Sequence, residues 1–106
     1  MKGLKAPPGL QPTGRRFWKL ATGEREFTES HDLARLFMAS RCLDEIAEDE
    51  QTVKAEGRYL EDRFGQKKEH PAANAIRQNK MLFIKIIREL GLDLVTTEDP
   101  RPPRQY

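Results

Sequence analysis

Residues 71–90 read PAANAIRQNKMLFIKIIREL, and this stretch decides the fold because its apolar side chains cover more of a helix than one neighbouring helix can bury. At about 100° per residue, the apolar positions spread over roughly 200° of the helix wheel, whereas a helix packed on one partner needs a stripe of only about 100°. A chain of 106 residues has little material for a second layer. The surplus therefore indicates a partner chain, with a tightly wrapped three-helix monomer as the alternative. The positions are Ala72, Ala73, Ala75, Ile76, Leu82, Phe83, Ile84, Ile86, Ile87 and Leu90.

The segments that precede this helix divide into an arm, a short helix and a second long helix. Residues 1–14 are rich in proline and glycine, so an extended arm is expected there. Residues 15–21 predict a short amphipathic helix. The second long helix is expected to begin at a start signal, with Thr28 or Ser30 as the cap, and to stop at Gly57.

Two long helices joined by residues 58–70 are expected to lie antiparallel. The joining segment predicts either an ordered loop or a short, irregular β-hairpin. His70-Pro71 sets an extended residue before a helix that begins with proline, and Gly91 ends that helix with Leu92 folded back on its last turn. The fold class is therefore all-α: a long antiparallel helical hairpin with a short N-terminal helix and extended tails. The parts are an arm at residues 1–14, one helical domain at 15–92 with an oligomerisation core at about 28–91, and a tail at 93–106.

The net charge of +2 conceals a separation of basic and acidic residues along the chain. Residues 1–23 carry five basic and no acidic side chains, residues 24–57 four basic and ten acidic ones, and residues 58–91 eight basic and four acidic ones. Such separation suits contact with an anionic partner at one place and self-association at another. No apolar run approaches the roughly 18 residues of a membrane span, and the first residues lack the apolar centre of a signal peptide. No membrane partner is expected, and the protein is expected to stay in the compartment where it is made.

Three polar residues fall within the apolar arcs of the two long helices: Glu50 in the first, and Asn79 and Lys80 in the second. Pairing outward from the connecting segment brings Glu50 about level with residues 77–80. We expect a partly buried Glu50–Lys80 contact, within a subunit or across to a neighbour, that fixes the helix register. In the alternative, both side chains reach out to water.

The residues that would carry catalysis or hold a cofactor do not form a recognisable set. The glycines are scattered singly, and no phosphate-binding loop occurs. His31 and His70 lie far apart, without a second His or Cys at metal spacing. Cys42 falls on an apolar arc and is interpreted as a small core residue, and the acid pair Asp44-Glu45 as part of a solvated face. We therefore expect no catalytic residue, no metal and no cofactor, and a protein that works by binding.

Several short motifs follow one another in a fixed order along residues 7–92. They are Pro8-Gly9-Leu10, Gly14-Arg15-Arg16-Phe17-Trp18, a long helix with Leu36, Cys42, Leu43 and Asp44 that ends at Gly57, then His70-Pro71-Ala72 and Arg88-Glu89-Leu90-Gly91-Leu92. In order and spacing they resemble phage terminase small subunits, in the short version found in many tailed phages. The continuation Asp93-Leu94-Val95-Thr96 departs from the Thr-Pro that many members carry after the final Leu-Gly-Leu.

The resemblance implies an all-α protein without catalytic residues that acts as the DNA-recognition half of a genome-packaging motor. Such proteins form homo-oligomeric rings in the host cytoplasm, bind double-stranded viral DNA and present it to a large subunit that carries the ATPase and nuclease. The DNA-binding candidates are basic residues of the acid-free N-terminus and of the segment between the long helices. They are Lys2, Lys5, Arg15, Arg16 and Lys19, with Lys67 and Lys68 as a second group.

The oligomer interface and the large-subunit contact are assigned from position along the chain. Ile76, Phe83 and Ile87 are expected to face the other long helix, while one flank of the same helix faces the next subunit. The interface candidates are Glu50, Asn79, Lys80, Leu82, Ile84 and Ile86, where the flank is either Leu82 with Ile86 or Ile84 alone. The candidates for an extended peptide that docks on the large subunit are Arg101, Arg104 and Tyr106.

Two other classes of protein fit the same pattern. An oligomeric helical adaptor or assembly protein would share the fold without binding nucleic acid, and salt-dependent DNA binding separates the two. A small sequence-specific repressor would form a dimer and need an exposed recognition helix, for which residues 77–80 are the candidate.

Overall fold

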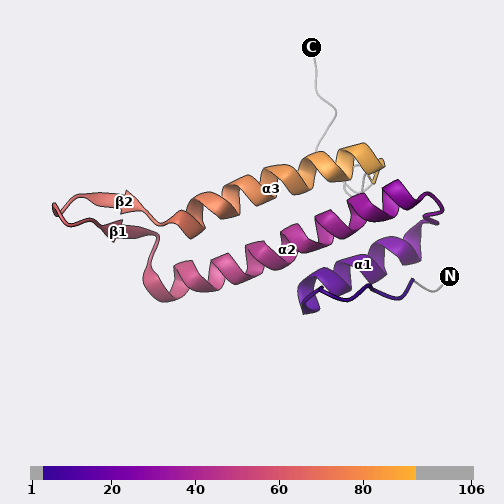
Figure 1. Cartoon of the computed structure of the whole chain (residues 1–106), viewed down its shortest axis with the longest axis horizontal. Helices are drawn as coiled ribbons and strands as arrows, with labels where there is room; N and C mark the ends of the chain where they lie inside the picture. The colour runs from indigo at the N-terminus through magenta and orange to yellow at the C-terminus, as the bar shows by residue number, and fades with distance from the viewer. Residues whose placement is uncertain (1–3, 93–106) are drawn as a thin grey trace, which may run out of the picture.

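The computed structural model describes residues 4–92 and shows a mostly helical protein with one small two-stranded sheet. The elements are α1 (Pro12–Glu24), α2 (Ser30–Glu56), β1 (Tyr59–Glu61), β2 (Lys67–Glu69) and α3 (Pro71–Leu90). In the view of Figure 1, α2 lies in the middle with α3 along one side and α1 along the other, and the strands extend beyond the long helices. The mostly helical class predicted from the sequence is confirmed.

The two long helices run in opposite directions along each other. Arg35, near the start of α2, lies beside Glu89 at the end of α3, with Nε 4.0 Å from Oε1. The strands that join the helices form an antiparallel pair in which Leu60 lies opposite Lys68. Residues 58–70 thus contain the β-hairpin rather than an ordered loop without strands.

The core lies where all three helices meet, at the end of the molecule away from the hairpin. Phe17 of α1 packs edge-on against Phe83 of α3, with ring centroids 5.3 Å apart, and Leu36 of α2 is fully buried. Cys42 is buried there as predicted, and this burial raises the pKa of its thiol, with a further contribution from the nearby charge of Glu45. The buried cluster comprises Leu10, Phe17, Trp18, Ala21, Phe27, Leu36, Ala39, Cys42, Ile86, Leu90 and Leu92.

Helix α1 is longer at both ends than the expected residues 15–21. It begins at Pro12, whose fixed φ suits a first helical position. The buried carboxylate of Asp44 accepts hydrogen bonds from the backbone N–H groups of Gln11 (2.7 Å) and Gly14 (2.6 Å). Because the N-terminus of a helix carries partial positive charge, this carboxylate caps α1 and ties it to α2. The interpretation of Asp44 as part of a solvated face was wrong, because its side chain is buried and hydrogen-bonded. The sequence does not show this contact, because Gly14 lies 30 residues away.

The arm before α1 packs against that helix. Leu10 is buried, and the backbone N–H of Leu4 donates to Oγ1 of Thr22 at 2.8 Å. The indole Nε1 of Trp18 donates to the backbone oxygen of Leu4 at 3.1 Å. These contacts join residues 4–11 to the helical domain.

The ends of the long helices lie close to the predicted residues. Helix α2 stops before Gly57, whose φ of 90° and ψ of 156° place it at positive φ but outside the left-handed helical region. Its start differs from the prediction, because Ser30 is already helical and Glu29 occupies the cap position without a side-chain cap hydrogen bond. Helix α3 ends at Gly91 in the left-handed conformation, and the N–H of Leu92 donates to a backbone oxygen of the last turn at 3.0 Å. This is the predicted fold-back.

Candidate nucleic-acid and subunit interfaces

A basic face runs along the exposed side of α1. Arg15, Arg16 and Lys19 follow one another at helical spacing on the side turned away from the core. Within residues 4–92 none of the three forms an ion pair, and the Arg15 guanidinium donates to a backbone oxygen of the arm at 3.1 Å. Lys5 is exposed in the arm, and Lys2 lies outside the described residues. The structure thus gathers three of the N-terminal candidates into one patch whose charges form no ion pair within residues 4–92.

The second basic group lies on the β-hairpin. Lys67 and Lys68 are neighbours on β2, so their side chains leave opposite faces of the strand pair. Lys68 is partly neutralised, because its Nζ lies 3.9 Å from Oδ2 of Asp62. Arg58 and Arg63, which sequence reasoning did not include, flank the first strand and are exposed. In the sequence each of them precedes an aromatic residue, Tyr59 or Phe64, and this pairing of basic and aromatic residues could have indicated them.

The two basic groups occupy separate regions of the molecule. Figure 1 shows α1 alongside the first half of α2, and the hairpin beyond its other end. A helix rises about 1.5 Å per residue, so the 27 residues of α2 span about 40 Å. One subunit therefore presents two basic patches and not one continuous surface.

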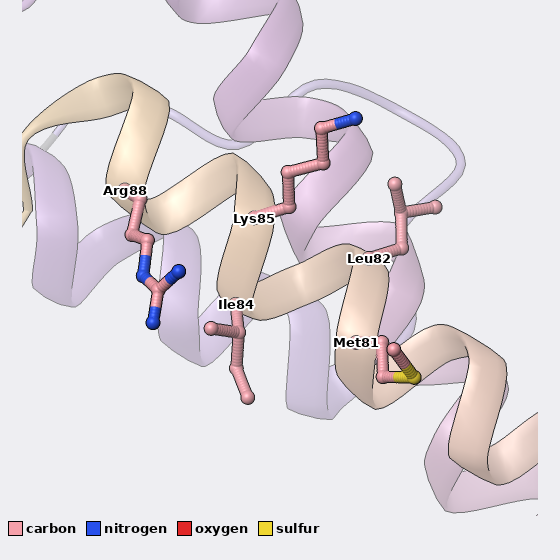
Figure 2. Close-up of a pocket in the computed structure, with 5 residues that line it drawn as sticks. All are labelled: Met81, Leu82, Ile84, Lys85 and Arg88. Carbon is pink, nitrogen blue, oxygen red and sulfur yellow. The ribbon is translucent and has the colours of Figure 1, made fainter.

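Helix α3 carries an exposed apolar strip with basic edges, which we call the α3 strip. Met81, Leu82 and Ile84 are 73%, 41% and 53% exposed, and Lys85 and Arg88 complete the strip. Figure 2 shows these five side chains projecting from consecutive turns of α3. Full burial of one such apolar side chain is worth about 1.5–3 kcal/mol. A contiguous exposed group of them marks a candidate interface.

The side of α3 that contains Ile86 and Leu90 packs within the chain. Ile86 is only 3% exposed and belongs to the core, so its assignment to the subunit interface was wrong. Ile86 is buried because it lies in the cluster to which both α1 and α2 contribute, where Phe17 of α1 also packs against Phe83. Leu82 and Ile84 remain accessible. The residues expected to face α2, which are Ile76, Phe83 and Ile87, are half-buried.

The pair Glu50 and Lys80 forms within one subunit but is not buried. Nζ of Lys80 lies 3.9 Å from Oε2 of Glu50, and the two side chains are 57% and 56% exposed. The expectation of a partly buried contact was wrong because the last buried residue of α2 is Ile46, before this level of the helix pair. An ion pair this exposed contributes about 0–1 kcal/mol, too little to fix the register alone. Asn79 lies half-buried on the preceding position of α3.

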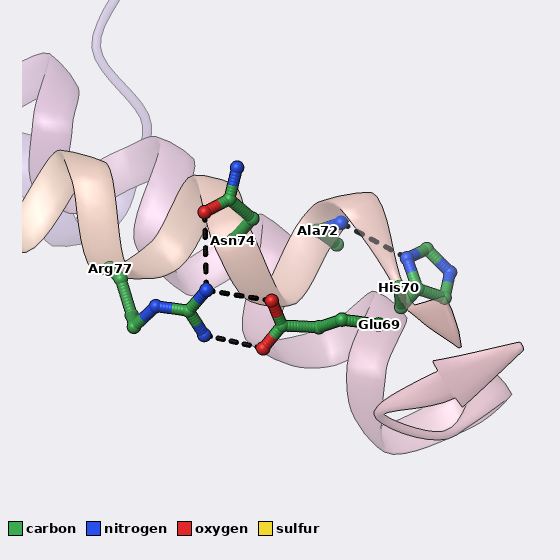
Figure 3. A network of polar contacts seen from close by, with 5 residues as sticks. All are labelled: Glu69, His70, Ala72, Asn74 and Arg77. Carbon is green, nitrogen blue, oxygen red and sulfur yellow. Dashed lines mark hydrogen bonds and ion pairs between the residues drawn. The ribbon is translucent and has the colours of Figure 1, made fainter. Parts of the chain in front are cut away.

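A network of polar contacts holds the hairpin to the start of α3 (Figure 3). His70 is the N-cap residue: its Nδ1 accepts the N–H of Ala72 at 3.0 Å, and its Nε2 lies 2.9 Å from Oε1 of Glu56. Arg77 reaches back to both carboxylate oxygens of Glu69, with Nη2 2.6 Å from Oε1. The Arg77 hydrogen bonds hold the pKa of the Glu69 carboxyl below its ordinary value. These contacts join the hairpin to the start of α3 and to the end of α2, and sequence reasoning missed them.

These contacts also occupy residues 77–80, the candidate recognition segment of a repressor. Arg77 is bound to Glu69, Asn79 is half-buried, and Lys80 lies beside Glu50. A recognition helix needs several side chains able to reach base edges. The repressor interpretation is therefore disfavoured.

The titratable side chains of residues 4–92 are placed apart from one another or are used within the fold. Within residues 4–92, no group of three or more His, Cys, Asp or Glu side chains is placed to hold a metal ion. Cys42 is buried with a raised thiol pKa, and Asp44 is committed to the cap of α1. No helix in this part of the chain is long and apolar enough to cross a bilayer.

The remaining candidates lie in the tail. Arg101, Arg104 and Tyr106, assigned to the large-subunit contact, fall outside the described residues.

The chain matches no family model, no curated protein and no solved structure. Any functional assignment therefore rests on its own sequence and surfaces.

Proposed function

We propose that this protein is the small terminase subunit of a phage DNA-packaging motor. It forms a homo-oligomeric ring in the host cytoplasm, binds double-stranded viral DNA and presents it to the large ATPase and nuclease subunit. The observation that carries the proposal is the basic face of α1, where Arg15, Arg16 and Lys19 are exposed without acidic partners among residues 4–92. The order of motifs along residues 7–92 supports it.

A patch of three basic side chains binds DNA weakly by itself, and repetition makes it effective. The logarithm of the DNA-binding constant falls linearly with the logarithm of the salt concentration, and each neutralised phosphate makes this slope steeper by about 0.9. In a ring the same patch recurs once per subunit, and linked contacts raise overall avidity by about 10²–10⁴. Retention of DNA then needs no base-specific contact from the α1 face.

The charges on the helix surfaces favour a ring over a symmetric dimer. Two copies of the α3 strip placed face to face would bring the basic side chains of one copy, Lys85 and Arg88, close to those of the other, and like charges repel. Residues 42–53 of α2 contain no basic side chain, and Glu45 and Glu48 are exposed there. A contact between the α3 strip of one copy and this acidic side of the next pairs charges of opposite sign. Such a head-to-tail contact forms a ring when the rotation between successive copies closes. The long helical hairpin is the unit that packs side by side.

The variant Arg16→Glu/Lys19→Glu tests the DNA-binding part of the proposal and leaves Arg15 to hold the arm. We expect retention of a double-stranded fragment at about 0.1 M salt to fall at least about tenfold, with a shallower salt dependence. The matched control is Arg41→Glu/Lys54→Glu, which reverses two exposed charges of α2 and is expected to bind like the wild type. Equal retention by the wild type and the α1 variant would contradict the assignment.

The mass of the assembly in solution tests the ring. Met81→Ser/Ile84→Ser is expected to shift the protein to monomers at micromolar concentration with unchanged helix content, whereas Leu20→Ser, at another exposed apolar position, is not. A monomeric wild type would contradict self-association. An assembled wild type that retains no DNA at low salt would instead support the alternative, an oligomeric helical adaptor without nucleic-acid binding.

A further inference from the structure

The tip of the β-hairpin holds an aromatic side chain out in water. Phe64 is 78% exposed, more than any other large apolar side chain in residues 4–92. Full burial of a phenylalanine is worth about 1.5–3 kcal/mol, a gain that the fold leaves unused here. The guanidinium of Arg63 lies over the ring, with Cζ 5.6 Å from its centroid. The tip therefore combines an apolar surface with a positive charge.

Hydrogen bonds fix the turn that presents Phe64. Oδ1 of Asp62 accepts from the backbone N–H groups of Phe64 (2.8 Å) and Gln66 (2.9 Å). The N–H of Gly65 donates to the backbone oxygen of Asp62 at 3.0 Å, and Gly65 has a φ of +79°, which residues with a Cβ rarely adopt. A side chain held ready in this way loses little conformational freedom on binding.

The charges that remain available at the tip are mostly positive. Asp62 is committed to the turn, and Nζ of Lys68 lies 3.9 Å from its second oxygen. Arg63 and Lys67 are exposed and form no ion pair within the described chain. A second acidic side chain, Glu61, lies opposite Lys67 in the strand register. A ligand that offers negative charges to Arg63 and Lys67 and stacked apolar groups to the Phe64 ring fits this tip best.

We propose that the hairpin tip enters the minor groove of double-stranded DNA and inserts Phe64 as a wedge at a base step, with Arg63 and Lys67 on the adjacent phosphates. This inference rests on the DNA binding proposed above and adds a contact that phosphates alone do not provide. Inserted apolar side chains partly unstack a step and kink the duplex, at a cost of a few kcal/mol that the added contacts offset. The hairpin extends beyond α2 and α3, so its tip reaches a groove ahead of the helices (Figure 1).

Relaxation of a closed circular plasmid by a topoisomerase, in the presence of the full chain, tests the wedge. Unstacking a base step changes the local twist of the duplex, whereas phosphate contacts only position the protein. We expect the wild type to shift the topoisomer distribution, Phe64→Ala to lose the shift while retaining DNA within about threefold, and Phe64→Trp to keep it. Gln66→Ala, in the same turn, is the matched control and is expected to behave like the wild type. Phe64 is not part of the core, so circular dichroism should show all variants folded.

Each contrary result has a separate meaning. A wild type that retains DNA without shifting the distribution overturns the wedge and leaves the proposed function standing, and so does a Phe64→Ala variant that shifts it as the wild type does. If Phe64→Ala lowers the mass of the assembly, the tip contacts another subunit and the wedge is likewise overturned. A wild type that retains no DNA at low salt overturns both proposals.

Discussion

Gly14 is the position where the packing of α1 on α2 leaves no room for a side chain. A Cβ at this position would lie 2.6 Å from the backbone oxygen of Ser40 and 2.8 Å from Cγ of Asp44, and closer still to Oδ2 of that residue. Rotation of Asp44 would relieve two of these approaches but would break its hydrogen bonds to Gln11 and Gly14. The oxygen of Ser40 belongs to the α2 backbone and cannot rotate away. An added methyl group must therefore push the helices apart.

Replacing Gly14 by alanine sets two effects of opposite sign against each other. Helix propensity alone predicts that alanine stabilises the folded state by about 1 kcal/mol. Loss of a hydrogen bond to a charged group costs about 1.5–3 kcal/mol, and overpacking costs about 1–3 kcal/mol. The steric effect wins, and we expect the free energy of unfolding to fall by about 2–4 kcal/mol.

Urea unfolding followed by the fluorescence of Trp18, which is buried in the core, measures this change. The control is the same substitution in an Asp44→Ala background, which removes the approach to the carboxylate but keeps that to Ser40. There the cost of Gly14→Ala should shrink by about 1–2 kcal/mol without vanishing, since contacting residues are not additive. A Gly14→Ala variant more stable than the wild type would refute the reasoning, because α1 would then sit on α2 loosely enough to accept a Cβ.

Three further results follow from the side-chain environments. The Cys42 thiol, buried and with a raised pKa, should react with a disulfide reagent at pH 8 only as fast as the protein opens, and immediate reaction would contradict its burial. Arg77→Ala should raise the pKa of the Glu69 carboxyl toward its ordinary value in an NMR titration. Because the pKa of Glu69 is lowered in the folded state, its pair with Arg77 stabilises the fold at pH values above the ordinary carboxyl pKa. This contribution is lost as the pH falls through the lowered pKa. A double-mutant cycle on Glu50 and Lys80 should give a coupling below about 1 kcal/mol, and a value near 3 would restore a buried register contact.

The start of α3 and the C-terminal ends of both long helices could be predicted from the sequence because their signals are local. A proline after His70 opens α3, and glycines at 57 and 91 take the positive φ values that stop α2 and α3. The burial of Cys42 followed in the same way from the spacing of its apolar neighbours. Each of these features depends on residues within one or two turns.

The start of α1 could not be predicted because it depends on a contact between distant residues. Asp44 stands in an acidic stretch and looks like a solvated side chain until α1 is placed beside it. A signal was nonetheless present in Gly14, since a glycine inside a helix costs about 1 kcal/mol relative to alanine and so indicates close approach of another backbone. The rotation of α3, which buries Ile86 and exposes Leu82, was missed for a related reason, because Ile86 packs in a cluster made of residues distant in the sequence.

The apolar surplus of α3 is smaller than the sequence indicates, but its position makes it more informative. Helix α1 helps to cover the flank that contains Ile86, and what remains exposed is the α3 strip. A rotation of α3 about its axis that buried the α3 strip would bring Ile86 and Leu90 out of the core. Such a rotation would therefore expose core residues in place of the strip. Burial of both sets needs further chain, and residues 4–92 already supply their three helices to the existing core. A partner is thus still expected, and substitutions in the strip should change assembly without changing the stability of the single subunit.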